Sequence, residues 1–237
     1  VGSEQITPFQ KMLGNYGPMD HFSIGKAASE EELNILLNQL SPYNLVIVGI
    51  NGMGMYPAKQ FGISSQQITL VKKLETCNTI TCFFGNPYAL PYFPSITTTK
   101  SLIVAYQNDV DAQEMAAQLI FGATGANGKL PVTIKEMFPV RSGIEIKPIQ
   151  RLKYTLPEEE NISTEYLQAK LDSLAEYGIQ KKAFPGCQVL VAKNGKVIFQ
   201  KSYGFHTYEK LQPVENDNLY DLASVTKVTA ALPAIMN

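Results

Sequence analysis

Three short runs of consecutive apolar residues constrain this chain most, because each is separated from the next by a segment with helical periodicity. Residues 45–48 (Leu-Val-Ile-Val), 80–84 (Ile-Thr-Cys-Phe-Phe) and 102–106 (Leu-Ile-Val-Ala-Tyr) are these runs. A strand buried on both faces shows such a continuous pattern, and strands that alternate with helices pair in parallel. The first ~140 residues therefore predict an α/β fold, a three-layer sandwich with a mainly parallel sheet.

Helix start signals precede or follow these runs. Ser29 with Glu32 forms a capping box, and the helix after it ends before Pro42. Ser64 or Ser65 opens a second helix, and Asp109 caps a third that ends at Gly122. These signals place one helix before the second strand and one after the third, as the α/β interpretation requires.

The pattern changes after residue 138. Residues 139–161 hold three prolines and the acidic run 158–160, and are predicted to be a linker. Beyond it, Ser163 caps a helix, Asn194-Gly195 predicts a hairpin turn, and a helix-like segment runs from Ser224 to the end. We therefore expect a first domain at 1–138 and, at 162–237, an incomplete α+β unit of helix, β-hairpin and second helix.

Composition excludes several classes of function. The 237 residues are 45% hydrophobic and 17% charged, with a formal net charge of -1 and no basic stripe, so neither nucleic acid nor a polybasic membrane contact is expected. No apolar run is long enough to span a membrane. The three cysteines have no zinc-site spacing, and His21 and His206 are far apart in sequence. No metal and no organic cofactor is implied.

The motif that carries chemistry is Ser224-Val225-Thr226-Lys227, of the form S-x-x-K. Residues three apart lie on one helix face, with Cβ atoms ~5–6 Å apart. A serine hydroxyl is a weak nucleophile until a base assists it, and a lysine amine can be that base. The same four residues could also be a helix cap followed by an ordinary lysine. Their position after a helix, a hairpin and a loop favours Ser224 as nucleophile and Lys227 as its partner.

An ordered set of short sequences in this region supports that choice. They are Pro-Gly-Cys-Gln-Val-Leu-Val at 185–191, Asn-Gly-Lys-Val at 194–197, Tyr-Gly at 203–204 and Leu-Tyr-Asp-Leu-Ala-Ser-Val-Thr-Lys at 219–227. This set resembles the serine β-lactamase and penicillin-binding esterase family of the class C type. The resemblance implies that Ser224 is acylated and that Lys227 assists proton transfer. The family also uses a Tyr-x-Asn element and a Lys/His-Thr/Ser-Gly strand downstream of the nucleophile. Neither follows within this chain, so we expect an inactive half-site in a fragment of a larger bacterial protein.

The first 138 residues carry a second resemblance. The sequence Phe-Gly-Asn-Pro-Tyr-Ala-Leu at 84–90 is followed by Phe-Gly at 121–122 and Gly-Lys-Leu-Pro-Val at 128–132. This order resembles the C-terminal α/β-sandwich domain of family 3 glycoside hydrolases. In the β-glucosidase branch a loop of this domain supplies a glutamate, but the matching loop here, 49–56, has no Asp or Glu. The resemblance therefore implies the β-N-acetylhexosaminidase branch, which works with an N-terminal barrel of the same parent chain.

Together the two resemblances imply a bifunctional hydrolase that acts on carbohydrate or cell-wall material. We expect it to be periplasmic or exported, because wall-directed hydrolases act outside the cytoplasm. The alternative is a non-catalytic, carbohydrate-facing scaffold module joined to a degenerate β-lactamase-like unit. The acid-free loop favours the alternative for the first unit, whereas the intact Ser224–Lys227 pair opposes it for the second.

Overall fold

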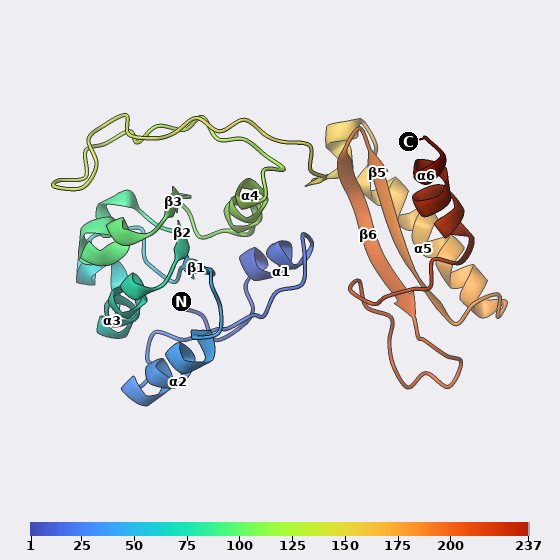
Figure 1. Cartoon of the computed structure of the whole chain (residues 1–237), viewed down its shortest axis with the longest axis horizontal. Coiled ribbons are helices and arrows are strands. Elements are labelled where there is room, and N and C mark those ends of the chain that lie inside the picture. The colour runs from blue at the N-terminus through green and yellow to red at the C-terminus, as the bar shows by residue number, and fades with distance from the viewer. Residues whose placement is uncertain (237) are drawn as a thin grey trace. The chain divides into compact units, whose positions relative to one another are not determined.

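The computed structural model describes residues 1–236, and the chain divides into two units, Val1–Arg151 and Leu152–Asn237 (Figure 1). The division falls within the segment 139–161. The expected end of the second domain, at Asn237, lies outside the described residues. Each unit has its own sheet.

The first unit is built on a three-stranded parallel sheet of order β1-β2-β3. Its strands are β1 (Val46–Ile50), β2 (Thr79–Phe83) and β3 (Ser101–Val104), and Ile50 lies opposite Phe83 in the register. All three apolar runs therefore form the predicted strands, and the α/β class with a parallel sheet is confirmed. The complete three-layer sandwich stays a prediction.

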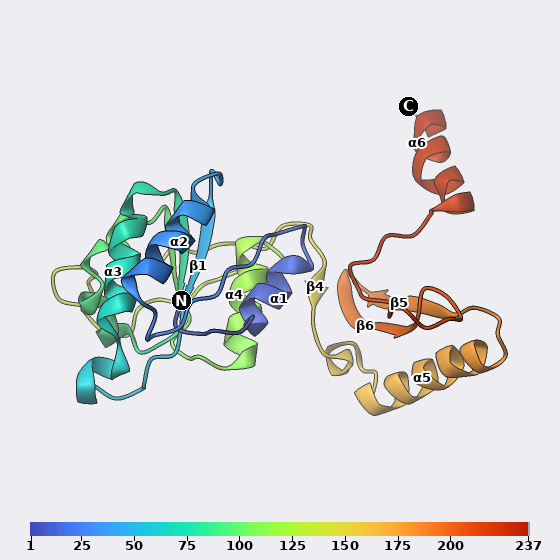
Figure 2. The same cartoon turned by 90° about the horizontal axis from the view of Figure 1, so that it is seen from below.

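Helices accompany this sheet on two sides. In Figure 2, α2 (Glu30–Leu40) and α3 (Ser65–Lys73) lie on one side, and α1 (Pro8–Gly14) and α4 (Val110–Ile120) on the other. Short 3₁₀ turns occupy Ala58–Gly62, Leu74–Thr76, Pro87–Tyr92 and Pro94–Thr98. The helices bury their apolar faces against the strands, which gives the unit its core. Its largest fully buried apolar side chains are those of Phe83, Phe84, Phe93, Ile50, Leu70, Leu90, Ile96 and Ile134.

The predicted helix starts are confirmed at the level of single hydrogen bonds. Ser29 accepts from the Glu32 N–H while the Glu32 carboxylate accepts from the Ser29 N–H, which is the reciprocal capping box. Ser64 forms the same box with Gln67. Asp109 caps α4 by accepting from the Ala112 N–H at 2.7 Å. These bonds satisfy N–H groups that the first turn of a helix leaves without partners.

The segment 139–161 is not a free linker, because both units bind parts of it. Ile146 forms a β-bridge with Ala126 in the first unit. In the second unit, β4 (Lys153–Tyr154) pairs with β6, and a 3₁₀ turn covers Pro157–Glu160. The acidic run expected to be solvated instead contributes Glu160, which is only 7% exposed and pairs with Lys196 at 2.8 Å. Ion pairing with lysines of the sheet explains why these carboxylates are drawn in.

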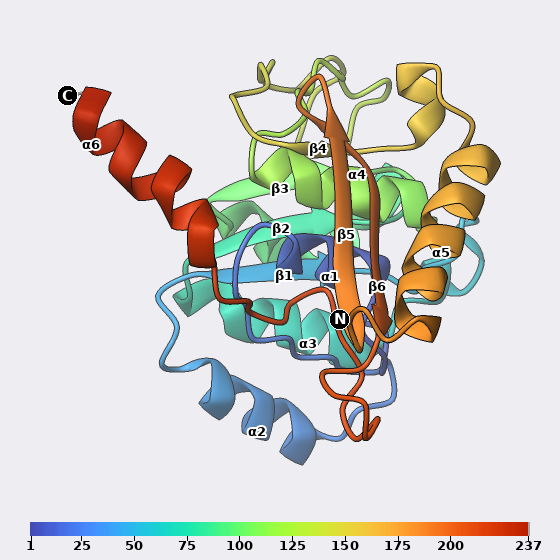
Figure 3. The same cartoon turned by 90° about the vertical axis from the view of Figure 1, so that its right-hand side faces the viewer.

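The second unit holds the predicted helix and hairpin. Ser163 caps α5 (Thr164–Gln180), and β5 (Gly186–Lys193) pairs antiparallel with β6 (Lys196–Gly204). Asn194 and Gly195 join them with φ angles of 52° and 77°, as a type I′ turn requires. The sheet order is β4-β6-β5, and α5 runs alongside the hairpin in Figures 1 and 3.

The chain then continues into three consecutive helical stretches. They are a 3₁₀ turn at Ala223–Val225, a π-helical stretch at Lys227–Ala231 and α6 at Leu232–Met236. Every described residue from 219 onwards is exposed. No helix among residues 1–236 is long and apolar enough to cross a membrane.

Candidate functional site

The S-x-x-K motif begins at a turn that Asp221 stabilises. The Ala223 N–H donates to Asp221 Oδ1 at 3.1 Å, and the Val225 N–H donates to the Leu222 carbonyl at 2.9 Å. Ala223 itself has a φ of 42°, in the left-handed region that side chains other than glycine rarely adopt. A short Asp side chain that bonds the backbone two residues on is typical of such turns. Asp221 therefore positions the residue that follows, Ser224.

The structure brings the two predicted site residues together. Lys227 Nζ lies 3.5 Å from Ser224 Oγ, so the amine faces the hydroxyl across one turn. This distance is at the outer limit of a hydrogen bond. Contacts between a nucleophile and its base are often this long before substrate binds. Both side chains are exposed in the described chain, so a substrate carbonyl can approach them.

The helix that carries the pair is not regular α-helix. The predicted helix from Ser224 onwards forms, but as the 3₁₀, π and α stretches given above. Two local features accompany the wide turn: Thr229 Oγ1 donates to the Val225 carbonyl at 3.1 Å, and Pro233 has no N–H to return to the Thr229 carbonyl. Both features disturb the i→i−4 ladder and are common where helices widen or bend.

Side chains of the hairpin hold the loop that leads to the motif. Gln188 on β5 donates to the backbone carbonyls of Glu215 and Asn218, the latter at 3.1 Å. The Asn218 side chain lies 2.8 Å from His206 Nε2 and accepts from the Glu215 N–H at 2.7 Å. The loop is thereby fixed to the end of β6, which sets the point from which the chain departs toward Ser224.

These anchoring residues were not identified from the sequence. Gln188 and Asn218 are 30 residues apart and meet only because the hairpin folds. The one local signal was Asp221, since an Asp two residues before a strained position is a common turn pattern. His206, treated as an ordinary histidine, has the structural role just described.

The tyrosines near the motif serve packing and local bonding. Tyr203 donates to Asp172 of α5, and Tyr208 donates to the Lys182 carbonyl at 2.7 Å. Tyr220 is 53% exposed. The sequence favoured packing over substrate contact for these residues, and the bonds of Tyr203 and Tyr208 agree with that reading.

In the first unit, loop 49–56 lies at the carboxyl end of β1. Asn51 is buried, and its carbonyl accepts from Gln67 Nε2 at 3.0 Å. Asn86, after β2, donates to the Met55 carbonyl at 3.1 Å. Carboxyl ends of parallel strands are where such sheets place ligands, but this loop brings no carboxylate there.

Residues that could hold a metal ion are not gathered in the described part of the chain: no group of three or more His, Cys, Asp or Glu side chains has suitable geometry there. The three cysteines are free, and only Cys82 is fully buried. Burial raises the pKa of the Cys82 thiol far above its ordinary range, which keeps it protonated and unreactive.

Helix, hairpin, anchored loop and a Ser–Lys pair on a following helix together define a segment of the serine β-lactamase type. The comparison with known families confirms this: residues 171–236 match the family described as Beta-lactamase. Protein flp of Staphylococcus aureus is 35% identical over 65 residues, which are 27% of this chain and 13% of that protein. Esterase EstB of Burkholderia gladioli is 30% identical over 69 residues, 29% of this chain and 18% of that protein.

A solved structure is also similar. It is that of a glycoside hydrolase family 3 beta-N-acetylglucosaminidase from Paenibacillus sp. str. FPU-7, with a TM-score of 0.38 and 19% identity, over 52% of this chain and 23% of that one. A likeness this slight carries no argument. The family 3 resemblance of the first unit rests on the sequences at 84–90, 121–122 and 128–132.

Proposed function

We propose that the second unit belongs to an acyl-serine hydrolase that acts on an amide or ester. The observation that carries the proposal is the 3.5 Å approach of Lys227 Nζ to Ser224 Oγ inside a segment that matches the Beta-lactamase family. Ser224 Oγ attacks the substrate carbonyl carbon, and a new O–C bond forms. The hydroxyl proton passes to the Lys227 amine in its neutral form, and the leaving group later takes a proton. Water then releases the acyl group.

The backbone supports this chemistry at one further point. The Ser224 N–H lies at the start of a helical segment, where unpaired N–H groups stabilise developing negative charge. A complete oxyanion hole needs a second donor, which the family takes from its Lys/His-Thr/Ser-Gly strand. We therefore propose that the 237 residues hold a half-site and do not turn over substrate by themselves.

For the first unit we propose an accessory role in a family 3 glycosidase of the β-N-acetylhexosaminidase type. The absence of Asp and Glu from loop 49–56 supports this, since a retaining glycosidase needs two carboxylates and both would then come from the barrel of the parent chain. The parent would be a bifunctional, exported hydrolase of carbohydrate or cell-wall material.

Labelling of the full-length protein with a fluorophosphonate probe tests the serine assignment. The probe should label the protein, and Ser224→Ala should abolish labelling. Thr226→Ala is the matched control, because it removes a neighbouring hydroxyl from the same motif and should leave labelling intact. Labelling that survives Ser224→Ala would show that another residue is the nucleophile.

A separate assay tests the glycosidase half. The full-length protein should release 4-nitrophenol from 4-nitrophenyl N-acetyl-β-glucosaminide faster than from the corresponding glucoside. The acid-free loop also favours a second candidate, in which the first unit is a non-catalytic carbohydrate-facing scaffold. Carbohydrate binding without hydrolysis of either glycoside would support that candidate instead.

A further inference from the structure

The backbone of Val1 begins a fourth line of sheet hydrogen bonds beside β1. The Val1 amine donates to the Gly49 carbonyl at 2.8 Å, and the Val1 carbonyl accepts from the Asn51 N–H at 3.0 Å. One residue that bonds in this way to the two residues flanking Ile50 has the geometry of a parallel ladder. Val1 therefore sits in strand register with β1, on the edge opposite β2.

The remainder of that edge is open. Along a parallel strand, alternate residues direct their N–H and C=O groups to opposite neighbours. Val46 and Ile50 bond toward β2: the Val46 N–H donates to the Asn78 carbonyl, and the Phe84 N–H donates to the Ile50 carbonyl, both at 2.9 Å. The N–H and C=O of Ile47 and the N–H of Gly49 consequently point to the Val1 side. No described residue bonds them there.

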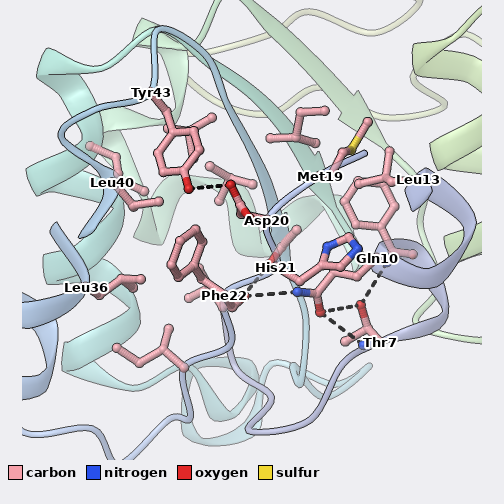
Figure 4. A pocket seen from close by; sticks show the side chains of 18 of the residues that line it. Thr7, Gln10, Leu13, Met19, Asp20, His21, Phe22, Leu36, Leu40 and Tyr43 are labelled. Carbon is pink, nitrogen blue, oxygen red and sulfur yellow. Dashed lines mark hydrogen bonds between the residues drawn. The ribbon is translucent and has the colours of Figure 1, made fainter. Parts of the chain in front are cut away.

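A cavity of about 280 Å³ lies along this open edge (Figure 4). Residues 45–49 form one wall. Apolar side chains from the helices on both sides of the sheet line the rest, among them Phe9, Leu13, Leu36, Leu40 and Leu70. Polar groups are fewer, and some are already paired, since Tyr43 donates to Asp20 Oδ2 at 2.6 Å. An apolar channel beside unpaired backbone groups suits an extended peptide better than a polar small molecule.

The environment of the Val1 nitrogen supports a peptide there. Burial lowers the pKa of the Val1 amine to about 6, because the charged form loses its hydration. A peptide N–H at the same point makes the same bond to Gly49 without a charge. The site therefore favours a polypeptide that passes through it.

We propose that this groove binds an extended apolar β-strand that runs parallel to β1 and leads directly into Val1. In this register the second residue before Val1 accepts from the Gly49 N–H and donates to the Ile47 carbonyl. The first residue before Val1 directs its N–H and C=O away from β1. Its occupant makes β1 an internal strand, and the sheet of the first unit gains a fourth strand.

Amide hydrogen exchange on the whole chain, with and without a four-residue extension Val-Ile-Val-Ile before Val1, tests the proposal. The extension should slow exchange of the Ile47 and Gly49 amides by about tenfold or more, because both become ladder donors. Amides of β2 serve as an internal reference. Unchanged exchange at both positions would overturn the proposal.

Two proline extensions test the register. Proline at the second position before Val1 aims its ring at β1 where an N–H is required, so the protection of Ile47 should be lost. Proline at the first position points its ring away and should leave the protection in place. Equal protection in both would mean that no strand occupies the groove in this register. A small apolar molecule that protects these amides more strongly than the Val-Ile-Val-Ile extension would identify a ligand pocket instead.

Discussion

The phenol of Tyr203 donates a 2.5 Å hydrogen bond to Asp172 Oδ1, and this bond joins β6 to α5. Lys201, two residues earlier on β6, donates to the same carboxylate at 2.8 Å. Tyr203 is 7% exposed, and burial raises the pKa of its phenol, as does the bond to Asp172. A neutral donor and two partners for one carboxylate make this the main polar contact between the helix and the hairpin.

Tyr203→Phe should therefore lower the free energy of unfolding of the second unit by about 1 kcal/mol, the net contribution of one such hydrogen bond. Urea unfolding followed by circular dichroism measures it. Tyr177→Phe, on the exposed side of α5 (60% exposed), is the control and should change nothing. Equal stability of Tyr203→Phe and the parent chain would mean that the bond contributes nothing net.

The acidic turn predicts a dependence of stability on pH. Hydrogen bonds from Lys153 and Thr155 lower the pKa of Glu159 from its ordinary value of 4.5 to about 2, and Lys196 adds to the effect. A pKa that is lower in the folded state means stability that is present above pH 4.5 and is lost as the pH falls toward 2. Glu159→Gln should flatten the acid limb of the stability curve in that window.

Thermal melts between pH 2 and pH 7 measure this effect. Glu165→Gln removes the same charge from the first turn of α5 without touching these lysines, and should keep the acid limb of the parent chain. If both variants lose stability on acidification as steeply as the parent, the ion pairs of Glu159 do not govern the acid response.

The hairpin turn predicts a difference between two glycines. Gly195 has a φ of 77° and open space where a Cβ would stand, so Gly195→Ala introduces only backbone strain. The cost should be about 1 kcal/mol. Gly128 has equally open surroundings but no positive φ, so Gly128→Ala should be neutral or slightly stabilising. Denaturant midpoints of the two variants give the comparison, and equal midpoints would contradict the assigned turn.

Local rules predicted the elements that local energy decides. Ser29, Ser64, Asp109 and Ser163 cap the helices expected of them, because a cap satisfies N–H groups within one turn. Asn194-Gly195 fixed the hairpin for the same reason. By the same rule α1 was predictable, since Thr7 and Gln10 form a capping box with Pro8 at the first turn, but its short apolar stretch gave no helical period.

Features that depend on distant partners were not predictable. β4 consists of two residues that pair with β6 some 40 positions later, and no sequence period marks a strand so short. Glu160 is buried because Lys196 and Asn194 face it, which a reading of the run 158–160 alone could not show. At the site, the spacing of Ser224 and Lys227 predicted their proximity, whereas the anchoring by Gln188 and Asn218 required the folded hairpin.

The last prediction concerns the role of Lys227 in the proposed acylation. Lys227→Met keeps the length of the side chain and removes the amine that lies 3.5 Å from Ser224 Oγ. Loss of a positioned base should slow fluorophosphonate labelling of the full-length protein by about 100-fold or more. The dependence of the labelling rate on pH should weaken as well, because the titrating group is gone. Lys170→Met, an exposed lysine of α5, removes an amine far along the sequence and should label at the parent rate. If Lys227→Met labels as fast as the parent with the same pH profile, the amine has no part in activating Ser224, and a different base must be sought beyond the S-x-x-K motif.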